Sequence, residues 1–381
     1  MTSDPVSAIR GWCPGAHRPM MSGDGLVVRI RPFRAHLDTG EVRRLCALAD
    51  RFGTGTLELT SRANLQIRGV ALADHGALLD ALDRAGLIDS DPEIERRRNI
   101  LMTPDWTAGD LSDRLHGALL RQLPLLPALP AKMGIAIDTG AAAQLRQGSA
   151  DMRFERTRDG QLLLRADGAA RGRRIDEDTA MTALAALVDW FVATGGADTG
   201  RMARHLARVP LPEDWQQAAP RPDHHAPEIG PQPGGQILGV PFGLIRAGDL
   251  AALMTLGGAS GLRLMTGRRL WLRDGAVRDA PGVVTRPGDP LMTVDACPGK
   301  PACPRATVET RALAARLAVL PRAGRLHVSG CAKGCARPVP AAVTLTGRDG
   351  CFDLVRNGRA QDDPVARALH PSRITDLSEY P

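Results

Sequence analysis

TLELTSRANLQIR, residues 56–68, and LRLMTGRRLWLR, residues 262–273, are two versions of one pattern: an alternating apolar segment, an arginine-containing turn and a second alternating segment. Alternation of this kind is typical of β-strands, and two such segments around a short turn predict a β-hairpin. The hairpins align when Leu59–Ile67 is laid over Leu264–Leu272. We therefore predict an internal duplication, and this duplication determines the fold.

A strand and a helix precede each hairpin. In the first copy, Gly25–Arg31 alternates and is rich in β-branched residues, and Thr39 is placed to cap a helix that ends at Gly53. In the second copy, Ile237–Val240 is a short strand and Gly248–Met254 opens a helix. Each copy is thus a strand–helix–strand–strand unit, and we expect the two units to join into one sheet.

The remainder of the chain mixes helices and strands, which predicts an α+β fold. Helices are expected near residues 73–85, 111–123, 179–194 and 307–320, and strands near residues 133–137, 161–165, 326–328 and 342–346. The expected divisions are a first half-unit with an N-terminal arm (1–88), an α/β lobe (89–209), a proline-rich linker (210–235), a second half-unit (236–280) and a cysteine-containing lobe (281–381).

Four cysteines form two closely spaced pairs in the last of these divisions. Cys297 and Cys303 are separated by five residues, and Cys331 and Cys335 by three. Four thiolates with glycine and proline between them are typical of loops that wrap an iron–sulfur cluster, so we predict a four-cysteine [4Fe–4S] site. The alternatives are structural zinc, which usually shows two-residue spacing within each pair, and ordinary buried thiols.

The other cysteines have weaker interpretations. Cys46 falls on the apolar face of a predicted helix and is expected in the core. Cys351 follows a glycine in a turn and has no partner signal. Cys13, in Trp12-Cys-Pro-Gly15, is left with three interpretations: a reactive thiol, a fifth cluster ligand or part of a structural turn.

The net charge of +7 predicts an anionic partner. Arginine supplies almost all of the positive charge, because the chain has three lysines, Lys132, Lys300 and Lys333. With 3% aromatic residues and no dense basic run, a nucleic-acid partner is not expected. Arginine suits bidentate contact with carboxylates, so a small polyanion fits the charge. No apolar run is long enough for a membrane span, and residues 1–10 lack a secretory signal, so a cytoplasmic location is expected.

Several stretches resemble the nitrite/sulfite reductase family. The most specific is HVSGCAKGCARP, residues 327–338, and DGLVVRIRP, LTSRANLQIRG, RRNILMTP and LPAKMGIAID match further family segments. The resemblance implies two ferredoxin-like half-domains forming one domain plus two α/β lobes, the C-terminal lobe binding the cluster through Cys297, Cys303, Cys331 and Cys335. It also implies a tetrapyrrole beside that cluster.

Within the family, RGWCPGAHRPMMSGDGL, residues 10–26, looks most like the branch of precorrin-3B synthases of aerobic cobalamin biosynthesis. That resemblance implies an O2-dependent monooxygenase that hydroxylates precorrin-3A and closes a γ-lactone, with electrons from NADH arriving through a separate reductase. No nucleotide-binding fingerprint is present. A mononuclear non-haem iron is also implied, although no two-His-one-carboxylate set stands out.

Family motifs transfer three basic residues to this sequence. Arg62, Arg98 and Lys132 match three of the four basic groups that bind the oxyanion in sulfite reductases, whereas Gly134 stands where the fourth, a lysine, is found. Losing a proton donor argues against sulfite or nitrite as substrate, because their six-electron reduction needs repeated protonation.

Three further arginines, Arg29, Arg31 and Arg268, are candidates for substrate carboxylates, with solvated positions as the alternative for the first two. The rival functions are a sirohaem-dependent sulfite or nitrite reductase, a non-catalytic tetrapyrrole carrier with a structural cluster, and a zinc-containing nucleic-acid binder.

Overall fold

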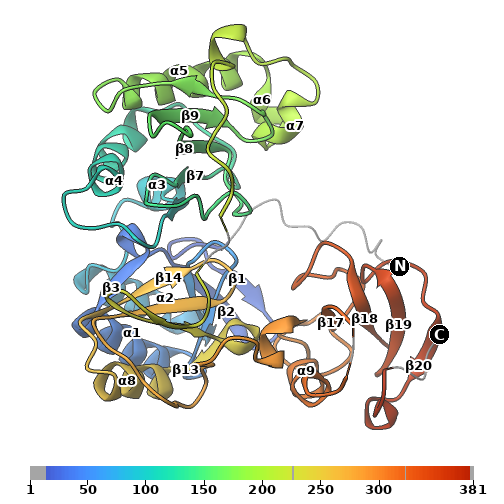
Figure 1. The fold of residues 1–381 in the computed structure, drawn as a ribbon. Coiled ribbons are helices and arrows are strands. Elements are labelled where there is room, and N and C mark those ends of the chain that lie inside the picture. Colours follow the sequence, from blue (N-terminus) through green and yellow to red (C-terminus); the bar gives the residue numbers. More distant parts are fainter. Residues whose placement is uncertain (1–13, 225–226, 322, 378–381) are drawn as a thin grey trace.

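The computed structural model describes residues 14–224, 227–321 and 323–377, and Figure 1 shows them as three bodies. The two half-domains together form the body at the lower left, the first lobe lies above it, and the C-terminal lobe lies to its right. In the described part of the chain the strands form four five-stranded sheets. No helix there is long and apolar enough to cross a membrane.

Each half-domain is built on one antiparallel sheet, and the predicted hairpins lie at its centre. The first sheet has the order β1 (Met20–Ser22), β2 (Gly25–Ile30), β5 (Leu65–Val70), β4 (Thr56–Leu59) and β13 (Leu244–Arg246). The second has the order β11 (Gly230–Gln232), β12 (Gly235–Gly239), β15 (Arg269–Arg273), β14 (Gly261–Met265) and β3 (His36–Asp38). The duplication is therefore present in the fold.

The half-domains exchange one short strand each. β13 comes from the second copy but pairs with β4, while β3 comes from the first copy but pairs with β14. The expectation of one joint sheet was wrong: the copies form two sheets joined by exchanged edge strands. Each three-residue strand covers an edge that would otherwise leave backbone groups unpaired, so neither sheet is complete without the other copy.

Helices α1 (Thr39–Phe52) and α8 (Ala247–Leu256) pack against each other beside these sheets, and α2 (His75–Arg84) packs on α1. The predicted cap of α1 is one residue off. Asp38 is the N-cap and accepts from the Glu41 amide at 2.7 Å, while the Glu41 carboxylate accepts from the Asp38 amide. Thr39, which directly follows β3, instead donates a hydrogen bond from its hydroxyl to the Ala259 carbonyl.

The first lobe has a mixed sheet in which three parallel strands are followed by two antiparallel ones. They are β6 (Ile100–Met102), β7 (Ile135–Ile137), β8 (Met152–Arg156), β9 (Leu162–Ala166) and β10 (Arg173–Arg174). Its helices are α3 (Pro92–Arg97), α4 (Leu111–Gln122), α5 (Ala180–Ala193), α6 (Gly196–Thr199) and α7 (Met202–Leu206). The predicted helices (α4 and α5) and strands (β7 and β9) of this region are confirmed, whereas α3, α6, α7, β6, β8 and β10 had not been expected.

The C-terminal lobe repeats that strand order. β16 (Val294–Ala296), β17 (Leu326–Ser329) and β18 (Ala341–Arg348) are parallel, and β19 (Cys351–Gly358) and β20 (Ala366–Leu369) continue antiparallel. α9 (Arg311–Ala318) connects β16 to β17. Both cysteine pairs follow parallel strands of this sheet, so its loops bring them to one end of the lobe.

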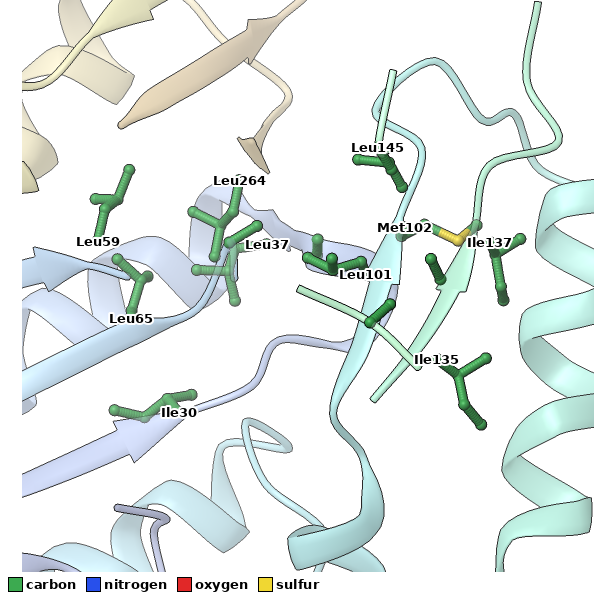
Figure 2. Close-up of a cluster of buried hydrophobic side chains, with 14 of the residues drawn as sticks. Ile30, Leu37, Leu59, Leu65, Leu101, Met102, Ile135, Ile137, Leu145 and Leu264 are labelled. Atoms are coloured by element: carbon green, nitrogen blue, oxygen red, sulfur yellow. The ribbon is translucent and has the colours of Figure 1, made fainter. Parts of the chain in front are cut away.

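The apolar interior is divided unevenly among the three bodies. One continuous cluster of buried side chains runs through both half-domains and the first lobe, and Figure 2 shows where it crosses between them. Its labelled members are Ile30, Leu37, Leu59, Leu65, Leu101, Met102, Ile135, Ile137, Leu145 and Leu264. The C-terminal lobe has a core of its own around Val328, Leu345 and Leu354. Cys46 is confirmed as a core residue, and burial raises the pKa of its thiol to about 12.

Candidate functional site

A cavity of about 600 Å³ opens between the half-domains and the C-terminal lobe. One wall comes from Leu59 and Ser61 at the first hairpin and from residues 267–269 at the second. The opposite wall is residues 295–298 and Cys335 of the C-terminal lobe. Apolar side chains such as Phe242 line the cavity between these walls. Its size lies within the range of cavities that bind cofactors and small ligands.

Two of the four predicted cluster cysteines line this cavity. Cys297 and Cys335 line it, and the Gly330 amide donates to the Cys297 sulfur at 3.2 Å. Cys335 lines the cavity and is exposed there. The pKa of its thiol is raised, mainly because the surrounding loops remove water from the sulfur. Lys333 opposes that rise in the pKa, and the sulfurs of the other three cysteines add to it. Cys335 therefore lies within electrostatic range of the other three cysteines.

Four thiols are the donor set that a cubane iron–sulfur cluster takes. Across residues 14–224, 227–321 and 323–377, no three His, Cys, Asp or Glu side chains are close enough to hold one metal ion. A cubane cluster does not require such closeness, because each cysteine binds a different iron at a different corner. The backbone N–H that reaches the Cys297 sulfur is also the kind of contact that tunes such clusters.

The segment before α9 is shaped by the cysteine loops. A helix was predicted from residue 307, but α9 begins at Arg311. The amide of Thr307 donates to the Gly330 carbonyl and the Val308 carbonyl accepts from the Lys300 amide, so both residues are held in the loops. The hydroxyl of Thr310 donates to the Cys297 carbonyl at 2.5 Å. These contacts with the loops take the place of the first helical turn.

The Cys303 loop is fastened to the first half-domain at one carbonyl oxygen. Ala302 O accepts from the Gly23 amide at 3.1 Å, from the Ser22 hydroxyl at 2.7 Å and from the Arg68 guanidinium at 2.9 Å. Arg68 is itself held by Asp24 at 2.9 Å. The β1–β2 turn thus positions the loop that carries the second cysteine.

Arg268 lies at the cavity, in an arginine cluster around Asp295. It ion-pairs with that carboxylate at 3.3 Å and donates to the Val294 carbonyl at 2.7 Å. Arg325 and Arg337 ion-pair with the same carboxylate at 3.1 and 3.3 Å. Three guanidinium groups around one carboxylate leave an excess of positive charge two residues from Cys297.

A second acidic group of this wall, Glu58, contacts two arginines, and one of them, Arg68, also pairs with Asp24. Glu58 pairs with Arg68 at 3.5 Å and with Arg311 at shorter range. Together, Asp295 and Glu58 form ion pairs with five arginines along the interface between the half-domains and the C-terminal lobe.

Arg62 and Lys132 are brought together by the fold, in a second basic region. Arg62, in the turn between β4 and β5, donates to the Lys132 carbonyl at 2.8 Å and to the Ser149 hydroxyl at 2.9 Å. Sequence reasoning missed Arg201, which donates to the same hydroxyl at 3.1 Å and pairs with Asp151 at 2.9 Å. No local motif marks Arg201, because it precedes a short helix far along the chain.

Arg98 and Arg31 are engaged by one buried carboxylate. Glu95 accepts from Arg31 at 3.0 Å and from Arg98 at 2.5 Å, and all three side chains are almost fully buried. The Arg98 guanidinium also stacks 3.8 Å above the Phe33 ring, and burial lowers its pKa although Glu95 opposes this. Contact of these two arginines with a substrate stays a prediction. Arg29 donates to the side-chain oxygen of Gln66, in the amide orientation that satisfies both groups.

Gly134 has no room for a side chain. A Cβ there would lie 2.8 Å from the Asn99 carbonyl oxygen, and the backbone exchanges hydrogen bonds with Asp151. A side chain at this position, such as the lysine that the resemblance to sulfite reductases implies, would therefore require the backbone at Asn99 or at residue 134 to shift. Cys13, the candidate fifth ligand, lies outside the described residues.

Comparisons with known proteins agree with this architecture. Residues 18–85 match the model of the nitrite/sulfite reductase ferredoxin-like half domain. The structure of the Mycobacterium tuberculosis NirA protein superposes with a TM-score of 0.66 at 19% identity, covering 93% of this chain and 79% of that one, which establishes the fold. A ferredoxin–nitrite reductase from Leptolyngbya laminosa is 26% identical over 88% of this chain and 79% of its own length.

A precorrin-3B synthase from a Sinorhizobium species is more similar. It is 32% identical over 95% of this chain and 86% of its own length. Identity at that level over nearly the whole of both chains, with the half-domains, the cysteine loops and the arginine-lined cavity in place, identifies the chain: it belongs to the precorrin-3B synthase family, enzymes built on the nitrite/sulfite reductase fold.

Proposed function

We propose that this chain is an O2-dependent monooxygenase that converts precorrin-3A to precorrin-3B in aerobic cobalamin biosynthesis. The observation that carries the proposal is its similarity to a precorrin-3B synthase along almost the whole chain. In the reaction, one oxygen atom of O2 enters the macrocycle with γ-lactone formation. Two electrons and two protons reduce the other oxygen atom to water, and NADH is the proposed source of the electrons, through a separate reductase.

The cavity supports the binding step of this proposal. Its apolar residues, including Leu59, Ile229 and Phe242, offer a surface for the macrocycle, as apolar linings do in most small-molecule sites. The arginines around Asp295 would bind the carboxylates of the acetate and propionate arms. Each charge-assisted hydrogen bond to a carboxylate contributes about 1.5–3 kcal/mol, so a few such bonds fix the orientation of the ring.

Cys297, Cys303, Cys331 and Cys335 would hold a [4Fe–4S] cluster. When bound, such a cluster supplies single electrons at the edge of the cavity. The chain's own residues prepare that position: Gly330 donates to the Cys297 sulfur, Thr310 holds the Cys297 carbonyl, and the β1–β2 turn fixes the loop of Cys303. A mononuclear non-haem iron stays a prediction without assigned ligands.

The proposal is tested with protein purified without oxygen and incubated with precorrin-3A. Isotopically labelled O2, NADH and a reductase are then admitted, and the product is analysed by mass spectrometry. We expect a mass gain of one labelled oxygen atom. No gain with protein that contains its full complement of iron would refute the monooxygenase. The Cys297→Ser variant serves as the control and should give no product.

The alternative is a sirohaem-dependent sulfite or nitrite reductase, which the ferredoxin–nitrite reductase similarity favours weakly. The missing side chain at Gly134 counts against it. Absorption spectroscopy of the purified protein separates the two, because sirohaem has strong visible bands whereas an iron–sulfur cluster gives a broad brown absorption.

A further inference from the structure

Arg201 is the residue around which a second carboxylate site can be assigned. It lies directly before α7, and its side chain is 25% exposed. Its Nε donates to the fully buried carboxylate of Asp151 at 2.9 Å. Asp151 also accepts from the Met202 amide and from the Gly134 amide, each at 3.0 Å. Arg201 is thus held by a carboxylate that is itself fixed on two further sides.

Arg201 and Arg62 converge on the same oxygen atoms. Both donate to the Ser149 hydroxyl oxygen, at 3.1 and 2.9 Å, and both donate to the Lys132 carbonyl, at 3.4 and 2.8 Å. Arg62 comes from a turn of the first half-domain, whereas the other three residues come from the first lobe. The two guanidinium groups are therefore brought together across the junction between these two bodies.

The hydrogen-bonding capacity of this cluster is one-sided. A hydroxyl has two acceptor positions and one donor, and a guanidinium can only donate. The two arginines occupy the acceptor positions of Ser149, which leaves its O–H as a donor, and the two lone pairs of the Lys132 carbonyl are likewise engaged. The remaining N–H groups of Arg201 add only donors. Such a set is complementary to a group that only accepts, and an ionised carboxylate is that group.

We propose that Arg201 and Ser149, positioned by Arg62 and the Lys132 carbonyl, form a subsite for one carboxylate arm of the macrocycle, with Arg201 as a substrate-binding residue. The subsite rests on the proposed function and extends it, because it assigns substrate contacts to the first lobe as well as to the cavity beside the cysteines. It also accounts for Gly134 beside Asp151: the charge that a lysine side chain would supply at this place comes from Arg201, whose carboxylate partner is hydrogen-bonded to the Gly134 amide.

The test is equilibrium binding of precorrin-3A, without O2 or reductant, followed by the quenching of tryptophan fluorescence. Arg201→Met is expected to raise the dissociation constant about ten- to hundredfold, the effect of losing charge-assisted hydrogen bonds. Ser149→Ala removes one donor without changing charge and should raise it by up to about tenfold. Arg201→Lys should restore part of the affinity. Arg204→Met, at an exposed position on the same helix, is the matched control and should bind as the unaltered protein does.

The outcomes separate the two proposals. Equal affinity in the unaltered protein, Arg201→Met and Ser149→Ala overturns the subsite and leaves the proposed function standing. Absence of binding to the unaltered protein overturns the proposed function and the subsite together. Arg201→Met could fail to fold because Asp151 loses its partner. In that case the dissociation constants of Ser149→Ala and Arg201→Lys test the subsite, since both variants keep a cation next to that carboxylate.

Discussion

Four cysteines lie in the loops that follow β16 and β17 at one end of the C-terminal sheet, and each is proposed as a ligand of a different iron. Replacing any one of Cys297, Cys303, Cys331 or Cys335 by serine should therefore lower bound iron and sulfide by most of their content in protein purified without oxygen. Cys351→Ser is the control, because Cys351 begins β19 away from the cavity. Iron content in any of the four variants equal to that of the control would contradict the assignment.

His116 should make the protein sensitive to acid. It is almost fully buried on α4, and its Nε2 accepts from the Arg34 amide at 3.3 Å. Burial, with Arg34 and Arg98 adding, lowers its pKa to about 4 against the opposing charge of Asp113. Because the folded pKa lies below the unfolded value of about 6.5, the unfolded chain binds the proton first, and stability is lost as pH falls from about 6.5 to 4.

The size of this effect can be measured by denaturant unfolding at pH 7 and pH 4. A shift of this size corresponds to a few kcal/mol at the acid end. His116→Gln, which keeps an acceptor for the Arg34 amide, should lose less unfolding free energy between the two pH values. Part of the loss should remain, since buried His327 also has its pKa lowered to about 4. His370→Gln, at an exposed position, is the control; equal losses in both variants would contradict the assignment.

Residues of the site were predictable from sequence only where a local motif marks them. The cysteines stand in short glycine-rich loops, so pattern and spacing point to them, whereas Arg62 stands in a predicted turn but was assigned to the site by the family resemblance. The partners that define their setting come from elsewhere in the chain: Glu95 engages Arg31 and Arg98, and Ser149 joins Arg62 to Arg201. Such pairings depend on tertiary contacts, which no single segment encodes.

At the scale of elements, the β1–β2 turn should control how well the cluster loop is held. A Cβ on Gly23 would lie 2.4 Å from the Pro301 carbonyl oxygen, so Gly23→Ala must push the turn and the Cys303 loop apart. We expect this variant to lose iron faster to a chelator than the unaltered protein. Gly76→Ala on α2, where a Cβ meets nothing within 4 Å, is the matched control and should keep its iron. Equal rates of loss in the two variants would show that the turn does not hold the loop.

Helices and hairpins followed from periodicity because each pattern is complete within its own segment. The exchange of β3 and β13 did not follow, since a three-residue strand carries no sign of which sheet edge it will cover. The start of α9 was misplaced for a related reason: tertiary hydrogen bonds to the cysteine loops hold residues 307–310 outside the helix, and three of these four residues are β-branched and weak helix formers.

At the scale of the whole molecule, the duplication extends beyond the half-domains. The two lobes share one order of three parallel and two antiparallel strands. Each hairpin turn also reaches its own lobe: Arg62 contacts Lys132 and Ser149, and Arg268 contacts Val294 and Asp295. The sequence pattern predicted the repeated hairpins, and the family resemblance implied two α/β lobes, but neither predicted that the lobes share one strand order, because the cysteine loops of the second lobe have no counterpart in the first.

The division of the interior predicts two unfolding transitions. One core spans the half-domains and the first lobe, and a separate one fills the C-terminal lobe. Ile245→Ala on the exchanged strand β13 and Leu354→Ala on β19 each remove a buried side chain, at a cost of about 2–5 kcal/mol. In calorimetry of the protein with its cluster intact, Ile245→Ala should lower the midpoint temperature only of the transition that belongs to the larger core. Leu354→Ala should lower only the midpoint temperature of the transition that belongs to the C-terminal lobe. If either substitution lowered both transitions equally, the contacts at Ala302 and Asp295 would bind the three bodies into one cooperative unit, and the two-core description would be wrong.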